Sequence, residues 1–97
     1  MAITIFLEFT AKAGTGDDIL AVLKEIVPGT RGYDGCIGND IYRSQENPDN
    51  LVIHGTWESK AHYEKYLAWR QESGVFDKFT ANLDGPPSLR YFDLTDV

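Results

Sequence analysis

The two histidines are the side chains of this sequence best suited to move protons near neutral pH. His54 lies three residues before Trp57 in a strand-like run, so alternation places these two side chains on opposite faces. Enclosed between two sheets, His54 would be a neutral general base; alternatively, it is a hydrogen-bonded polar residue in a dimer core. His62 has charged neighbours, including Lys60, and is expected on the solvated surface.

A second group of chemically capable side chains has helical spacing. Tyr63, Tyr66, Leu67 and Arg70 recur at i, i+3, i+4 and i+7, which predicts one face of a helix. This face is either simply part of the core or, with Trp57, a slot for a flat aromatic ligand. Buried hydroxyls and charges need hydrogen bonds, and in the second case Tyr66 would bond to the oxygen of the ligand.

Polar residues within the predicted strands are the remaining candidates. Asn39 and Arg43 share one face of a strand, and Tyr42 lies on the other. Asn39 could donate to an oxyanion and Arg43 could clamp a ligand, or both could be cross-strand partners. Glu8 is either an acid inside a barrel or an ion-pair partner of a neighbouring strand.

The elements that must position these residues follow from periodicity and turn residues. A capping box of Thr15 and Asp18 is expected to open the first helix, and Pro28 with Gly29 to end it. Ser59 is expected to cap the second helix, and Gly74 to end it. The expected elements are a strand at 3–9, a helix at 16–28, strands at 36–44 and 51–57, helices at 60–72 and 75–83, and a strand at 89–94.

This β-α-β-β-α-β order predicts a ferredoxin-like α+β fold with a four-stranded antiparallel sheet and all helices on one face. The other face would be uncovered and would carry Phe6 and Val52. The last strand has large apolar groups on both faces, with Leu89 and Tyr91 opposite Phe92 and Leu94. An apolar face of this size is an association surface, so we predict a homodimer that packs sheet against sheet.

Composition narrows the classes of function. A chain of 97 residues without a linker or repeat predicts a single domain over 1–97. Its net charge of −6 and scattered basic residues argue against a nucleic-acid partner. No apolar run approaches a membrane span and no signal-peptide pattern is evident, so a cytoplasmic protein is expected. Cys36 is the only cysteine, and the sequence has no dinucleotide-binding or phosphate-loop motif. We therefore expect neither a metal site nor a cofactor.

Two phrases and one strand resemble a known family. The phrases are Thr30-Arg31-Gly32-Tyr33-Asp34-Gly35-Cys36 and Tyr42-Arg43-Ser44-Gln45-Glu46-Asn47-Pro48-Asp49, and the strand ends at Trp57-Glu58-Ser59. Together they resemble the antibiotic biosynthesis monooxygenase family of small dimeric α+β barrels. The resemblance runs from the first strand to the helix after Trp57. Members include cofactor-free oxygenases of polycyclic phenols and quinols, haem-degrading enzymes, and domains of undefined role.

The resemblance carries over to few residues. Trp57 matches the tryptophan that lines the family's pocket between sheet and helices. A histidine often follows it by nine residues, but Tyr66 stands there in this chain. Haem-degrading members have an asparagine on the first strand and a haem-ligating histidine near the end of the helical region. In this chain Leu7 stands at the position of the asparagine, and Thr80 or a neighbour stands at that of the histidine. The resemblance therefore argues against haem degradation.

The resemblance therefore implies a homodimeric, cofactor-independent monooxygenase that oxidises a planar phenol or quinol with O₂. The predicted catalytic residues are His54 as base, with Trp57 and Tyr66 forming the pocket. The predicted substrate-binding residues are Asn39, Arg43, Tyr63 and Arg70. The alternative is a non-catalytic small-molecule-binding or stress-response domain that uses the same slot.

Overall fold

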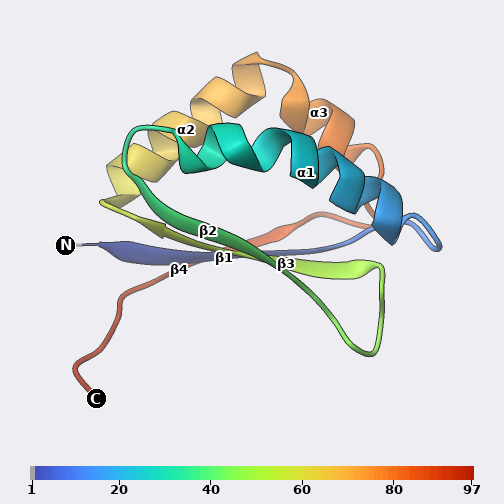
Figure 1. The fold of residues 1–97 in the computed structure, drawn as a ribbon, viewed down its shortest axis with the longest axis horizontal. Coiled ribbons are helices and arrows are strands. Elements are labelled where there is room, and N and C mark those ends of the chain that lie inside the picture. Colours follow the sequence, from blue (N-terminus) through green and yellow to red (C-terminus); the bar gives the residue numbers. More distant parts are fainter. Residues whose placement is uncertain (1) are drawn as a thin grey trace.

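The computed structural model describes residues 2–97. Strands and helices alternate in the predicted order (Figure 1). The elements are β1 (Ile3–Thr10), α1 (Gly16–Arg31), β2 (Cys36–Arg43), β3 (Asn50–Trp57), α2 (Lys60–Glu72), α3 (Val75–Thr80) and β4 (Ser88–Phe92).

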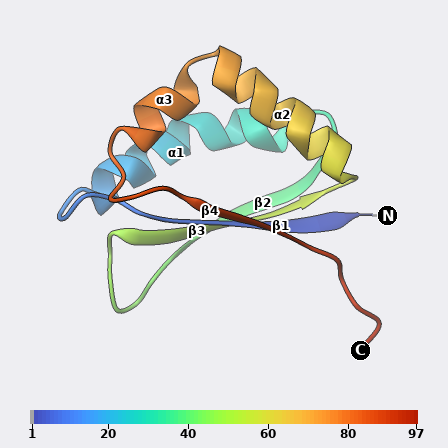
Figure 2. The same cartoon turned by 180° about the vertical axis from the view of Figure 1, so that it is seen from behind.

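The four strands form one antiparallel sheet in the order β2-β3-β1-β4. All three helices lie over the same face, and the opposite face is uncovered in both views (Figures 1 and 2). The predicted ferredoxin-like α+β fold is therefore confirmed. None of the helices within residues 2–97 has the length and apolar character needed to cross a membrane.

Strand alternation explains where the core lies. On β1, Ile5 and Phe9 are almost fully buried, whereas Glu8 on the opposite face is exposed. On β3, Leu51 and Trp57 are fully buried toward the same side. The core thus fills the space between sheet and helices, as the period-2 pattern predicts.

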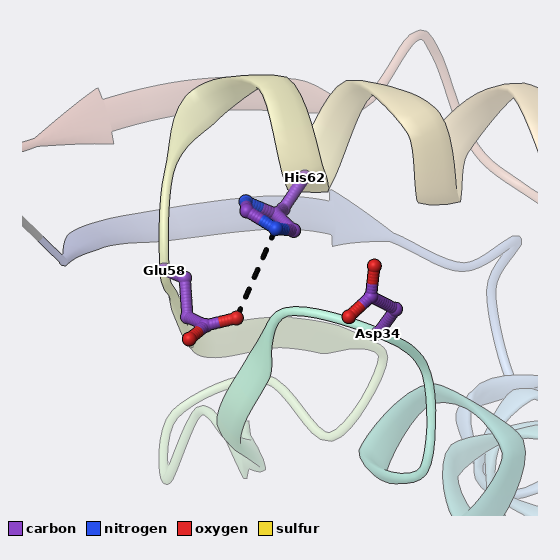
Figure 3. Close-up of side chains that lie close together, drawn as sticks. All are labelled: Asp34, Glu58 and His62. Carbon is purple, nitrogen blue, oxygen red and sulfur yellow. Dashed lines mark ion pairs between the residues drawn. The ribbon is translucent and has the colours of Figure 1, made fainter.

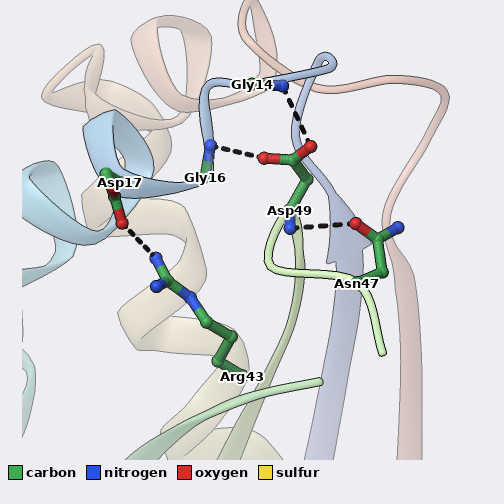
Figure 4. Close-up of polar contacts among 6 residues, drawn as sticks. All are labelled: Gly14, Gly16, Asp17, Arg43, Asn47 and Asp49. Atoms are coloured by element: carbon green, nitrogen blue, oxygen red, sulfur yellow. Dashed lines mark hydrogen bonds and ion pairs between the residues drawn. The ribbon is translucent and has the colours of Figure 1, made fainter. Parts of the chain in front are cut away.

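The start of α1 was predicted correctly, but its expected cap is wrong. The Thr15 side chain makes no capping hydrogen bond and instead donates to the Lys12 carbonyl at 2.6 Å. The Asp49 carboxylate accepts from the backbone N–H groups of Gly14 at 3.0 Å and Gly16 at 2.8 Å (Figure 4). Asp49 comes from the β2–β3 turn, so this helix terminus is satisfied by a long-range contact that local spacing cannot show.

We expect Asp49→Ala to lower the free energy of unfolding by about 1–2 kcal/mol, because free N–H groups at a helix start lose their acceptor. The negative charge near the N-terminus of α1 is lost as well. Asp18→Ala, which removes an exposed first-turn carboxylate with no such bond, is the matched control. Urea unfolding of both variants measures the difference, and equal midpoints would refute this role of Asp49.

The expected end of α1 at Pro28 is also wrong, because the helix continues through this residue to Arg31. Proline removes only its own N–H from the helix ladder, and the following turn is anchored by tertiary contacts. Thr30 is only 4% exposed, and its hydroxyl lies 2.6 Å from the Tyr66 hydroxyl on α2. Packing between α1 and α2 therefore outweighs the local signal.

The second helical segment follows its predicted signals more closely. The Ser59 hydroxyl accepts from the backbone N–H of His62 at 3.2 Å, which confirms the predicted N-cap of α2. Gly74 has a φ of +77°, a left-handed conformation that favours glycine and separates α2 from α3. Helix α3 and strand β4 each end earlier than expected, at Thr80 and Phe92.

Candidate functional site

A partly enclosed, mostly apolar cavity of about 40 Å³ lies between the sheet and the helices. Aliphatic and aromatic side chains make up most of its wall, and four polar residues interrupt them. This volume suits roughly one water molecule and is too small for an aromatic ring. The lining residues are Ile5, Leu7, Leu23, Ile26, Val27, Thr30, Asn39, Ile53, Tyr63, Tyr66, Phe76 and Phe79.

Trp57 borders this region with a buried, unused hydrogen-bond donor. Its side chain is 0% exposed, and its ring centroid lies 4.9 Å from that of Tyr66 and 5.2 Å from that of Tyr63. The indole Nε1 has no hydrogen-bond partner within residues 2–97. A buried donor without a partner costs about 1–3 kcal/mol, so this one calls for an explanation.

Gly55 packs directly beside this donor. A methyl group at Gly55 would lie 3.1 Å from Trp57 Nε1, 3.3 Å from Asn39 Oδ1 and 3.1 Å from Ile5 Cγ1. Such contacts are tight, so only glycine fits here without displacing its neighbours. The indole Nε1 and the Asn39 amide oxygen therefore both lie close to the Gly55 backbone.

Asn39 is 5% exposed and lines the cavity from β2. Strand alternation alone leaves open which face of β2 meets the helices, and the structure shows that it is the face carrying Asn39. Its backbone carbonyl accepts a hydrogen bond from Arg31 Nε at 3.0 Å, which ties β2 to the end of α1. The side-chain amide faces the cavity and carries both donors and an acceptor. It can therefore bind an oxygen held beside Trp57.

A network of hydroxyls and one guanidinium forms the opposite wall. Tyr66 and Thr30 line the cavity, and Arg70 lies behind them at 5% exposure. Arg70 Nε donates to the Tyr66 hydroxyl at 3.0 Å, and Nη2 donates to Thr30 Oγ1 at 3.1 Å. Tyr63, Tyr66 and Arg70 of the predicted stripe are thus buried, and the Tyr66 hydroxyl and the Arg70 guanidinium are hydrogen-bonded.

Tyr63 completes the polar lining. Burial raises the pKa of its hydroxyl strongly, and the neighbouring Tyr66 and Tyr91 add to this effect. The Tyr63 hydroxyl therefore stays protonated at neutral pH. It can donate a hydrogen bond to a ligand, but it is unsuited to be a base.

The structure places His54 on the open face of the sheet, away from the cavity. His54 stacks on Phe6 with 5.0 Å between ring centroids and an interplanar angle of 22°. The ring centroid of Tyr42 lies 6.3 Å from that of His54, and the ring centroid of Phe92 lies 5.4 Å from that of Phe6. These four side chains, one from each strand, form an aromatic row across the open face. The sheet itself separates this row from Trp57 and Tyr66.

Arg43 does not reach the cavity either. Its Nη2 pairs with the Asp17 carboxylate at 2.7 Å, and the Asp17 side chain is 91% exposed (Figure 4). The predicted ligand clamp is placed in an ion pair between β2 and the first turn of α1. Of the seven predicted site residues, five therefore gather around the cavity: Asn39, Trp57, Tyr63, Tyr66 and Arg70.

A separate cluster offers the ligand types that a divalent cation accepts. Side-chain atoms of Asp34, Glu58 and His62 all lie within 4.8 Å of one another (Figure 3). His62 Nε2 lies 3.8 Å from Glu58, and its Nδ1 lies 2.6 Å from Ser59 Oγ. Both carboxylates are exposed, and Lys65 lies 4.0 Å from Asp34. Ion pairing accounts for this arrangement without a metal ion.

The same cluster explains why glycine stands at position 35 of the first phrase. Gly35 has a φ of +92°, and a methyl group there would lie 2.5 Å from His62 Cβ. Only glycine allows the α1–β2 loop to pack this closely against α2. His62, expected on the surface, is 37% exposed and half-covered by this loop.

Two residues of the site were missed by sequence reasoning. Thr30 was read only as part of a phrase after the helix, and Gly55 only as a strand residue. A glycine in a strand that contains several β-branched residues signals that a neighbouring group lies close to the backbone there. This signal is visible in the sequence. Nothing local marks Thr30, since its role depends on α2.

The model of the antibiotic biosynthesis monooxygenase family matches residues 2–75 of this chain. No curated protein matches the sequence. Among solved structures, Rv0793 from Mycobacterium tuberculosis is similar with 18% identity and a TM-score of 0.86, over 100% of this chain and 98% of its own. A conserved protein from Methanosarcina mazei has 18% identity and a TM-score of 0.85, over 95% of this chain and 91% of its own.

SnoaB, a cofactor-independent oxygenase from Streptomyces nogalater, is also similar. It has 14% identity and a TM-score of 0.84, over 99% of this chain and 95% of its own. Identities this low establish a common fold and nothing about shared chemistry.

Proposed function

Since this chain belongs to the antibiotic biosynthesis monooxygenase family, we propose that it is a cofactor-independent monooxygenase of a planar phenol or quinol. The observation that carries the proposal is the buried indole N–H of Trp57, which has no partner within residues 2–97 and lies beside the Asn39 amide. A donor kept free at such a cost is accounted for by a ligand oxygen. The description of SnoaB as a cofactor-independent oxygenase agrees with this proposal.

The reaction needs little from the protein beyond binding. The substrate anion donates electrons to O₂, and a carbon–oxygen bond forms at a ring carbon. That carbon loses its proton, the O–O bond breaks, and water leaves with the second oxygen atom. One phenol and one O₂ thus give one quinone and one water. Trp57 and Asn39 would stabilise the phenolate oxygen, and the apolar walls would exclude water.

The cavity must enlarge before a substrate can enter, because about 40 Å³ cannot hold an aromatic ring. Phe76 is the lining residue we expect to move. It is half-buried and belongs to the six-residue α3, whereas Tyr63 and Tyr66 are fixed by α2. Opening at α3 would extend the cavity along the helices without disturbing the sheet.

The small volume of the cavity also favours the second candidate, a non-catalytic binding or stress-response domain. No histidine or carboxylate lines the cavity in the part of the chain that the structure describes. A domain that only binds its ligand needs neither a base nor room for O₂. The two candidates differ in turnover, which a direct measurement separates.

The deciding experiment is oxygen consumption by chelator-treated protein with a panel of quinols and polycyclic phenols. We expect uptake above the rate of spontaneous oxidation for at least one of them, with one O₂ consumed per quinone formed. Binding without uptake would support the non-catalytic candidate. Failure of every compound to cause uptake would remove the enzyme proposal for this panel.

His54→Ala tests the base that the sequence suggested. Because the sheet separates His54 from the cavity, we expect oxygen uptake to stay within about twofold of the wild type. His62→Ala serves as the control for loss of an imidazole elsewhere. A loss of uptake greater than about tenfold in His54→Ala alone would return His54 to the mechanism.

We also propose that the protein acts as a homodimer joined through the open sheet face. The aromatic row Tyr42–His54–Phe6–Phe92 supports this, because it crosses all four strands and Phe92 and Tyr42 are 42% and 55% exposed. A second copy that covers this surface removes apolar side chains from water, which favours association. Identical sheets are self-complementary about a two-fold axis.

A further inference from the structure

We infer that the cavity selects a ligand that carries a negative charge, and that Arg70 supplies this selectivity through Tyr66 and Thr30. The inference rests on the proposed site and goes further by naming the charge state in which the ligand is taken up. Its basis is a buried cation that the protein leaves without a full counter-charge.

Arg70 lies in the core without a carboxylate partner. It is 5% exposed, and the ion pairs within residues 2–97 involve Arg43, His62 and Lys65 instead. The chain has 15 acidic and 9 basic residues, so carboxylates are in excess. Burying a charge is costly unless it is compensated, and a buried pair broken on one side typically costs several kcal/mol.

The compensation that Arg70 does receive is partial. Its Nη2 donates to the Ile26 carbonyl at 2.7 Å, a neutral acceptor in the second half of α1. The guanidinium also lies 4.4 Å from the centroid of the Trp69 ring, and this cation–π contact stabilises the buried positive charge further. Part of the positive charge still remains for a ligand to balance.

Hydrogen bonds carry the influence of Arg70 to the cavity wall. The guanidinium donates to the Tyr66 hydroxyl at 3.0 Å and to Thr30 Oγ1 at 3.1 Å, and these oxygens lie 2.6 Å apart. The bond between the two hydroxyls uses only one of their two protons. When Thr30 donates to Tyr66, the Tyr66 proton is free to point into the cavity.

The rest of the lining fits an anion in the same way. Tyr63 keeps its proton because burial raises its pKa, and Trp57 offers only an N–H. Asn39, Tyr63 and Tyr66 line the cavity with groups that can donate, and the Trp57 indole packs against both tyrosines. A cation lies directly behind the Tyr66 hydroxyl. An ionised phenol or enol oxygen is the group that this arrangement recognises best.

The test compares two aromatic probes that differ in charge. 2-Hydroxy-1,4-naphthoquinone is an anion at neutral pH, and 2-methoxy-1,4-naphthoquinone is its neutral ether. Both are already quinones, so binding can be titrated without turnover. For the wild type we expect the anion to bind at least about tenfold more tightly. In Arg70→Met we expect the preference to fall to within about twofold, whereas Arg43→Met keeps it.

Each outcome decides a different question. Equal affinities of the wild type for both probes would overturn the inference and leave the proposed aromatic site intact. Absence of binding for both would remove the proposed site as well. A preference that survives in Arg70→Met would also overturn the role of Arg70. Where Arg70→Met does not fold, Tyr66→Phe, which removes the intervening hydroxyl and keeps the charge, is expected to weaken the preference about threefold or more.

Discussion

Trp57→Phe is expected to lower the rate of oxygen uptake about 10²–10³-fold, the usual effect of losing one donor to a developing oxyanion. Phenylalanine keeps an aromatic ring between Tyr63 and Tyr66 but has no N–H. The fall is expected in kcat, because the oxyanion accumulates most charge as the carbon–oxygen bond forms.

The same substitution is expected to leave the fold intact and its stability little changed or higher. In the wild type the indole N–H is buried without a partner within residues 2–97, which costs about 1–3 kcal/mol. Removing the donor removes this penalty, and the smaller ring loses some packing in return. Lower activity without lower stability is the signature of a donor retained for function.

Trp69→Phe is the matched control, because Trp69 is 40% exposed and phenylalanine keeps the aromatic ring that lies against the Arg70 guanidinium. Oxygen uptake and thermal melting of both variants give the comparison. If Trp57→Phe turned over as fast as the wild type, the indole N–H would have no part in the reaction. The proposal would then lose the observation that carries it.

Phe6→Glu is expected to convert the proposed dimer to a monomer. Phe6 lies at the centre of the aromatic row, between His54 and Phe92. In a sheet-to-sheet dimer, each copy would bury a carboxylate against an apolar surface. We expect the dissociation constant to rise at least about 10³-fold, or roughly 4 kcal/mol.

Sedimentation velocity over a range of concentrations measures this change. Ala61→Glu, an exposed substitution on α2 at the other side of the molecule, is the control for added charge. A wild-type protein that is monomeric at high concentration would rule out the dimer. A Phe6→Glu variant with the wild-type dissociation constant would place the interface elsewhere.

The helix boundaries show how far local signals reach. Ser59 caps α2 as predicted, because its acceptor and donor are three residues apart in the sequence. The cap of α1 is the carboxylate of Asp49, 33 residues beyond Gly16. Pro28 fails to end α1 because Thr30 is held by Tyr66 and Arg70 across the helix interface. Contacts distant in sequence overrule propensity in both places.

The candidate site divides in the same way. Periodicity correctly put Tyr63, Tyr66 and Arg70 on one helical face, and strand alternation separated His54 from Trp57. Neither pattern could show that Arg43 forms an ion pair with Asp17, since this pair joins β2 to α1. Nor could it include Thr30, which becomes part of the site only when α1 and α2 pack together.

By itself, the sequence determined the order of elements, the family, and which site residues share a face of the same helix or strand. These properties depend on periodicity and turn chemistry, which act between neighbours in the chain. The tertiary structure alone decided which polar groups lack partners among residues 2–97: the Trp57 N–H beside Gly55, and Arg70 without a carboxylate. A hydrogen bond or ion pair requires two groups within a few ångströms, and only the folded chain brings residues so distant in sequence to that separation.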